Sequence, residues 1–128
     1  MSRDQQKISA SKSTPEVILD PDGTIKFTGR LIPENAEDFF HPIVEWIDEY
    51  FVSPAEVTSI EICLEYINSA GTRYLLEIFR NITHVHLGKN TRKFIINWCY
   101  TDEDEDILEK GKIFSSELDV PVNFIRIS

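Results

Sequence analysis

The chain has 128 residues, a length typical of one domain, and close to a third of them are Leu, Ile, Val or Phe, which is enough for a packed core. The 22 acidic residues outnumber the 13 basic ones and give a net charge of −9, so the surface repels nucleic-acid phosphates and anionic lipid headgroups. No apolar run approaches the roughly 20 residues that span a bilayer, and no charged and then apolar leader opens the chain. We therefore expect a cytoplasmic domain with no nucleic-acid partner and no membrane insertion.

Residues 1–14 are predicted to form a disordered tail, and residues 15–128 the folded domain. The tail is rich in Ser, Gln and Lys, and Met1 and Ile8 are its large apolar side chains. Beyond it, alternating apolar residues predict strands, and apolar residues spaced by three and four predict helices. The expected elements are strands at 16–20 and 25–30, a helix at 36–51, a strand at 57–67, a helix at 69–87, a strand at 93–100, a helix at 102–118 and a strand at 122–127.

The order of these elements, β-β-α-β-α-β-α-β, indicates an α/β fold. Pro21, Asp22 and Gly23 have the composition of a tight turn, so the first two strands are expected to form a hairpin. The later strands alternate with helices, and right-handed crossovers would place them in parallel. The sequence therefore predicts a single domain with a mixed β-sheet and helices mainly on one face.

Cys63 and Cys99 lie far apart in the sequence and belong to no CxxC pair. A zinc site needs more thiolate or imidazole ligands at short spacing, and a secreted disulfide scaffold has more cysteines in a shorter chain. We expect free thiols in a reducing compartment.

The acidic run at residues 102–106 has the spacing of a calcium loop only in its first part. Such a loop needs Gly at its sixth position and Glu at its twelfth, where this chain has Ile107 and Ile113. The run is better interpreted as the acidic first turn of a helix, with Thr101 as its N-cap. The alternative is a small-ligand or metal-binding regulatory domain that uses this helix start near Trp98 and Tyr100.

No catalytic constellation is recognisable, so we expect neither an enzyme nor a cofactor. His84 and His86 are two residues apart and would point to different faces of a helix, and His41 lies elsewhere. The sequence contains no HExxH, no GxSxG, no Walker loop and no dinucleotide fingerprint. No metal site and no catalytic residues are predicted.

The junction between the strand at 57–67 and the following helix carries the strongest functional signal. Asn68 or Ser69 is suited to cap the helix by accepting a backbone N–H. A helix N-terminus also presents free N–H groups and the positive end of the helix dipole, which would stabilise a phosphate on Ser69. Arg73, one turn further, could pair with that phosphate.

The element order around this junction resembles the anti-sigma-factor-antagonist (STAS-like) fold, and the detailed motifs resemble the SiaC family of bacterial regulatory phosphoproteins. The motifs are Pro33-Glu34-Asn35 with the Phe-rich helix through Trp46, the stretch from Tyr66 to Gly71, and Asn97-Trp98-Cys99-Tyr100 followed by the acidic run. The final segment at residues 122–127 fits as well. The resemblance covers nearly everything after residue 15.

The resemblance implies a non-enzymatic switch. In that family a dedicated kinase phosphorylates a Thr or Ser after the strand, a PPM-type phosphatase removes the phosphate, and the unphosphorylated form activates a diguanylate cyclase in cyclic-di-GMP and biofilm control. Ser69 falls where the family usually has Thr, and because Ala70 and Gly71 replace the hydroxyl residues that follow, Thr72 is a rival acceptor. The implied partner-binding surface comprises Tyr66, Asn68, Ala70, Gly71 and Arg73.

Overall fold

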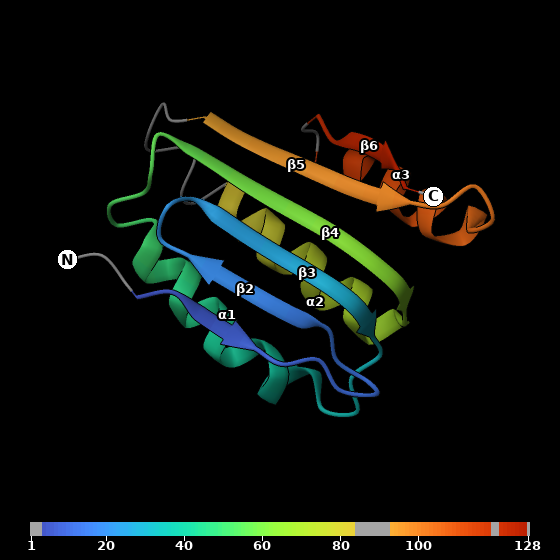
Figure 1. Cartoon of the computed structure of the whole chain (residues 1–128), viewed down its shortest axis with the longest axis horizontal. Helices are drawn as coiled ribbons and strands as arrows, with labels where there is room; N and C mark the ends of the chain where they lie inside the picture. The colour runs from blue at the N-terminus through green and yellow to red at the C-terminus, as the bar shows by residue number, and fades with distance from the viewer. Residues whose placement is uncertain (1–3, 84–92, 119–120, 128) are drawn as a thin grey trace.

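The computed structural model describes residues 4–83, 93–118 and 121–127, which form a mixed six-stranded sheet with three helices packed on one of its faces (Figure 1). The strand order is sequential, and the two pairings among β1, β2 and β3 are antiparallel, whereas β3 to β6 pair in parallel. The predicted α/β class, the mixed sheet and the one-sided helices are confirmed. The elements are β1 (Gln6–Ile8), β2 (Glu16–Asp20), β3 (Thr24–Leu31), α1 (Ala36–Tyr50), β4 (Val57–Ile67), α2 (Ser69–Asn81), β5 (Lys93–Tyr100), α3 (Glu105–Leu118) and β6 (Asn123–Arg126).

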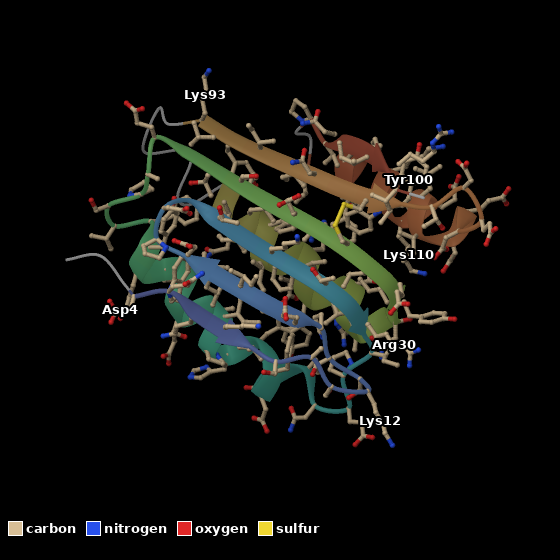
Figure 2. All side chains as sticks on the ribbon, viewed as in Figure 1. Asp4, Lys12, Arg30, Lys93, Tyr100 and Lys110 are labelled. Carbon is tan, nitrogen blue, oxygen red and sulfur yellow. A yellow bond between two sulfur atoms is a disulfide. The ribbon has the colours of Figure 1, made fainter. Side chains whose placement is uncertain are left out.

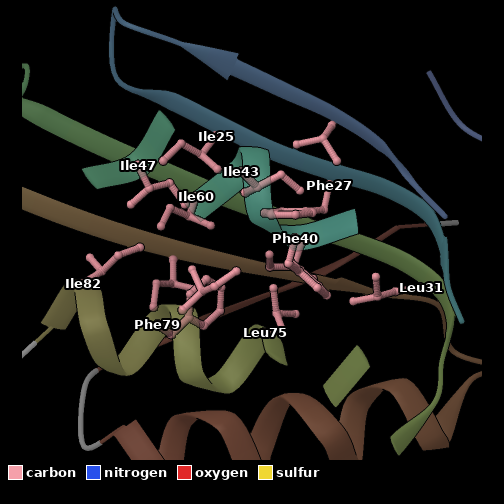
Figure 3. Packing of buried hydrophobic residues seen from close by; sticks show 14 of the residues in the cluster. Ile25, Phe27, Leu31, Phe40, Ile43, Ile47, Ile60, Leu75, Phe79 and Ile82 are labelled. Carbon is pink, nitrogen blue, oxygen red and sulfur yellow. The ribbon is translucent and has the colours of Figure 1, made fainter. Parts of the chain in front are cut away.

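The core lies between the sheet and the helices (Figure 3). Alternate residues of each central strand point to the helices, so Phe27 of β3 and Ile60 of β4 are fully buried. The helices contribute apolar stripes at helical spacing, including Phe40 and Ile43 from α1 and Phe79 from α2. The face opposite the helices is more polar, as the sequence alternation predicted.

The predicted hairpin between β2 and β3 depends on Gly23. Gly23 has a φ of 113°, which favours glycine, and its amide donates to the Asp20 carbonyl at 3.0 Å. The Gly23 carbonyl accepts from the Ser59 amide at 2.7 Å, and a Cβ at this position would collide with the Val57 carbonyl. The turn therefore joins the hairpin to the start of β4.

The expectation of a disordered tail over residues 1–14 is wrong for its central part. Gln6–Ile8 forms strand β1, which pairs antiparallel with β2 at the edge of the sheet. The indole N–H of Trp46 in α1 donates to the Asp4 carbonyl at 3.3 Å. Three residues are too few to show the alternation of apolar and polar side chains that indicates a strand. The strand is therefore recognised by its pairing with β2, and its own sequence does not predict it.

Several element boundaries differ from the predicted ones. The described part of α2 ends at Asn81, and the expected continuation to residue 87, with His84 and His86, lies outside the described residues. Helix α3 begins at Glu105, and Asp104 caps it by accepting the Ile107 amide at 3.1 Å, so the expected cap at Thr101 is wrong. Within the described residues, no helix combines the length and apolar character that crossing a membrane requires.

The expectation of free thiols is also wrong. Cys63 of β4 and Cys99 of β5 are joined in a disulfide, with Cα atoms 4.8 Å apart (Figure 2). The parallel register of these strands pairs Ile62 with Trp98, and the two cysteines follow directly in the same register. Cysteines separated by 36 residues in sequence are therefore neighbours because of strand pairing, which the spacing alone does not reveal.

Candidate functional site

The candidate site lies where β4 ends and α2 begins, at the carboxyl edge of the parallel strands. Asn68 follows the last residue of β4, and its amide donates to the carbonyl of Leu31, the last residue of β3, at 3.0 Å. This bond fixes the chain as it leaves the sheet. The first turn of α2 is consequently held in place by two neighbouring strands.

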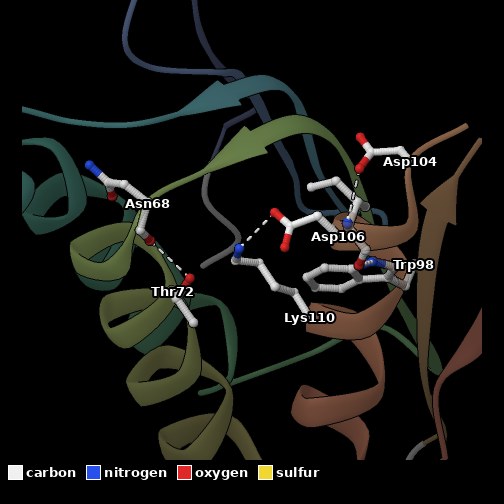
Figure 4. A network of polar contacts seen from close by, with 7 residues as sticks. Asn68, Thr72, Trp98, Asp104, Asp106 and Lys110 are labelled. Carbon is white, nitrogen blue, oxygen red and sulfur yellow. Dashed lines mark hydrogen bonds and ion pairs between the residues drawn. The ribbon is translucent and has the colours of Figure 1, made fainter.

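Asn68 is the N-cap of α2, so the structure decides between the two capping candidates. Its side-chain oxygen accepts the Gly71 amide at 2.7 Å (Figure 4 shows Asn68 at the start of the helix). Ser69 is the first residue of the helix and its side chain is exposed. Because Asn68 already supplies the cap, the Ser69 hydroxyl forms no hydrogen bond with any other described residue.

Thr72, the rival acceptor, has a hydroxyl that is already engaged. It donates to the Asn68 carbonyl at 2.9 Å, as the dashed line in Figure 4 marks, and the side chain is half-buried. Such a bond to the carbonyl four residues earlier is an ordinary conformation for threonine in a helix. Of the two hydroxyl groups in this turn, the Ser69 hydroxyl is therefore the more accessible.

The small residues of the turn allow α2 to approach β3 closely. Gly71 is buried, and a Cβ there would lie 2.7 Å from the Leu31 carbonyl oxygen and 2.8 Å from the Leu31 side chain. Ala70 is half-buried and packs against the core. Gly71 thus faces inward, and its expected place on a partner-binding surface is wrong because close packing against β3 uses that face of the helix.

Two other residues of the expected surface are exposed. Tyr66 is 60% exposed, and the guanidinium of Arg30 on β3 lies 5.6 Å from the centre of its ring. Arg73 is exposed on the second turn of α2. Tyr66 at the end of β4, and Ser69 and Arg73 in the first two turns of α2, are therefore all exposed.

The charges at the three helix starts differ in a way that matters for a phosphate. The first turn of α1 carries Glu37 and Asp38, and that of α3 carries Glu105 and Asp106, whereas the first turn of α2 has no acidic residue. Carboxylates in a first turn complement the positive end of the helix dipole. In α2 this positive end is left without a carboxylate, directly beneath Ser69.

Lys110 is a basic residue near this turn that the sequence did not indicate. Arg80 near the end of α2 pairs with Glu117 near the end of α3 at 2.9 Å, so the two helices run side by side and Lys110 comes opposite the first turns of α2. Figure 4 shows Lys110 on α3 facing the turn that holds Thr72, with its ammonium group 2.9 Å from Asp106. The signal that was available is the spacing of Asp106 and Lys110 by four residues, which indicates a helical ion pair.

Side chains of the acidic run form hydrogen bonds and ion pairs at the start of α3 and at the end of β6. Asp104 caps α3, Asp106 pairs with Lys110, and Asp102 lies 3.5 Å from Arg126. Beside the run, a hollow of about 280 Å³ opens where β4 and β5 diverge, lined by Tyr66, Tyr100 and Asp104 among others. Within the described part of the chain, no group of three or more His, Cys, Asp or Glu side chains is placed to hold a metal ion.

The structure defines a single α/β domain, a mixed six-stranded sheet covered on one face by three helices, with an exposed serine at the start of α2. A family model described as SiaC family regulatory phosphoprotein matches residues 8–127. The chain belongs to the SiaC family.

Solved structures of similar fold agree with this assignment. A chain in the crystal structure of the diguanylate cyclase SiaD in complex with its activator SiaC from Pseudomonas aeruginosa matches with a TM-score of 0.85 and 20% identity, covering 95% of this chain and 99% of that chain. The crystal structure of apo-SiaC from the same organism matches with a TM-score of 0.83 and 20% identity, covering 98% and 100%. At this identity the likeness shows the fold. No curated protein sequence matches the chain.

Proposed function

We propose that this protein is a non-enzymatic, cytoplasmic signalling switch that is reversibly phosphorylated on Ser69. A Ser/Thr protein kinase adds the phosphate, a PPM-type phosphatase removes it, and the unphosphorylated form binds and regulates an effector such as a diguanylate cyclase. Membership of a family of regulatory phosphoproteins supports this proposal, as does the solved complex between a SiaC protein and the cyclase it activates.

The observation that carries the proposal is the division of roles between Asn68 and Ser69. Asn68 caps α2, which leaves the exposed Ser69 hydroxyl available for phosphorylation. The Thr72 hydroxyl, in contrast, would have to give up its bond to the Asn68 carbonyl. Ser69 is therefore the favoured acceptor and Thr72 the rival.

The same turn can hold the product of phosphorylation without refolding. A phosphate adds nearly two negative charges and three acceptor oxygens. The free N–H groups and positive dipole end of α2 lie next to it, and Arg73 and Lys110 are basic residues within the neighbouring turns. A partner that packs over Tyr66 and Ser69 would have to desolvate this charge, so its affinity should fall.

The proposal is tested by incubating the protein with the cognate kinase and ATP and mapping the phosphopeptide. We expect one phosphate on Ser69, no phosphate on Ser69→Ala, and unchanged phosphorylation of Thr72→Val. Phosphate on Thr72 in the parent protein would show that Ser69 is not the acceptor. Melting temperatures with and without calcium or magnesium test the alternative metal-dependent function in the same samples.

Effector binding is the second part of the test. The unphosphorylated protein and Ser69→Ala should bind the effector with equal affinity. The phosphorylated protein should bind it much more weakly, at a melting temperature that is equal or slightly higher. Equal affinity of the phosphorylated and unphosphorylated forms would contradict the switch.

A further inference from the structure

The seam between α1 and α2, on the outer side of the helical layer, contains a preformed apolar groove of about 280 Å³. Its floor consists of the buried side chains Phe40, Ile47 and Ile78, and the half-buried Val44 and Tyr74 form its walls. The groove is open to solvent along both helices. An apolar hollow between helices is suited to receive large side chains of a further helix.

The two helices are fixed to each other at both ends of the groove. At one end the rings of Phe40 and Tyr74 stack with their centres 5.5 Å apart and nearly parallel planes. At the other end the Asn81 amide donates to the Asp48 carboxylate at 3.2 Å. A partner would therefore bind a groove that is already formed, with little cost for ordering it.

The charge around the groove is acidic. Glu37 and Glu77 line it, and no lysine or arginine is present among its lining residues, all of which the structure describes. Helix α1 carries four further carboxylates, and its described residues include no lysine or arginine. An apolar floor between acidic rims is complementary to an amphipathic helix with basic residues beside its apolar stripe.

The groove and the Ser69 site occupy different faces of α2. Ala70, Tyr74, Glu77 and Asn81 recur at helical spacing on the side that faces α1. Ser69, Arg73 and Arg80 recur on another side, and Arg80 pairs with Glu117 of α3. A ligand in the groove therefore need not cover the serine.

We propose that the α1–α2 groove is a second docking site, which binds a basic amphipathic helix of a partner protein independently of phosphorylation at Ser69. A second copy of this chain is a poorer occupant, because two molecules of net charge −9 repel each other. The described N-terminal residues also do not fill it, since β1 pairs with β2 at the sheet edge.

The probe for this proposal is a fluorescently labelled amphipathic helical peptide made of leucine and lysine. A leucine–glutamate peptide of the same pattern serves as the charge control. We expect saturable binding of the leucine–lysine peptide by fluorescence anisotropy, and at least about tenfold weaker binding by Val44→Lys and by Glu77→Lys. Ser69→Asp should bind the peptide as the parent does.

The matched control variant is Ile113→Lys, which places the same charge at an apolar residue of α3 that is 53% exposed and lies outside the groove. It should retain parental affinity, and melting temperatures verify that each variant is folded. The proposal would be overturned if Val44→Lys bound the peptide as tightly as the parent does, or if Ile113→Lys weakened binding equally. It would also be overturned if the leucine–glutamate peptide bound as tightly as the leucine–lysine peptide. A dimer in light scattering that Val44→Lys dissociates would assign the groove to a second copy, and weaker binding by Ser69→Asp would refute its independence from the switch.

Discussion

Replacing Asn68 by Ala should destabilise the protein, whereas replacing its neighbour Ser69 by Ala should not. Both residues are polar and stand at the same helix start. Only Asn68 accepts a backbone amide, that of Gly71 at 2.7 Å. The pair of variants therefore tests the division of roles on which the proposed function depends.

The expected magnitude follows from the burial of the groups involved. Loss of an N-cap costs about 0.5–2 kcal/mol. Here the Gly71 amide belongs to a buried residue and would lose its acceptor, which places the cost in the upper half of that range, about 1–2 kcal/mol. Ser69→Ala removes an exposed hydroxyl and introduces the best helix former, so the free energy of unfolding should stay within about 0.5 kcal/mol of the parent.

Urea denaturation followed by circular dichroism measures both free energies of unfolding. Asn68→Ala should lower the midpoint with an unchanged m-value, equivalent to a fall of roughly 3–10 °C in melting temperature. Asn68→Ser, which keeps a capping oxygen, should recover most of the loss. If Ser69→Ala is as destabilising as Asn68→Ala, the serine is part of the cap and our reasoning about its availability is wrong.

Three further predictions concern packing and the acidic run. Gly111→Ala would place a Cβ 2.7 Å from the indole ring of Trp98, which is buried and donates to the Ile107 carbonyl, so we expect a net loss of about 1–2 kcal/mol and a changed tryptophan fluorescence spectrum. An unchanged spectrum and stability would show that the helix moves away freely. Gly23→Ala should lower the free energy of unfolding more, by about 3 kcal/mol or more in urea denaturation, because it combines a positive φ with a collision against the Val57 carbonyl. A loss under about 1 kcal/mol would argue against this turn geometry. Asp104→Ala should cost about 0.5–2 kcal/mol through loss of the α3 cap, with no change in the response of the melting temperature to calcium or magnesium. A metal-dependent stabilisation that this variant abolishes would instead support a cation site in the acidic run.

The fold class could be predicted because its signals are local. Alternation along residues 57–67 and 93–100 indicates strands, and the spacing of Phe40, Ile43 and Ile47 indicates a helix. Pro21, Asp22 and Gly23 likewise determine a turn through their own backbone preferences. Strands that alternate with helices then leave few arrangements other than a parallel sheet.

The sequence located the candidate site, but it did not assign the separate roles of Asn68 and Ser69 there. Asn68 and Ser69 are both good N-caps, and no property of either residue alone decides between them. The choice depends on where β4 stops, which is set by the bond from the Asn68 amide to Leu31 on a different strand. The inward position of Gly71 follows from the same contact.

Three of the features that the sequence missed join segments that are distant in the chain. Strand β1 forms against β2, Cys63 meets Cys99 through the register of β4 and β5, and Lys110 reaches the first turns of α2 because α2 and α3 lie side by side. Side-chain periodicity reports which face of an element is buried, but it carries no information about which other element covers that face. The sequence alone therefore determined every described element except β1, and it located the hydroxyl-bearing turn. The tertiary structure decided which hydroxyl is free, and the packing of α2 beside α3 brought Lys110 opposite this turn.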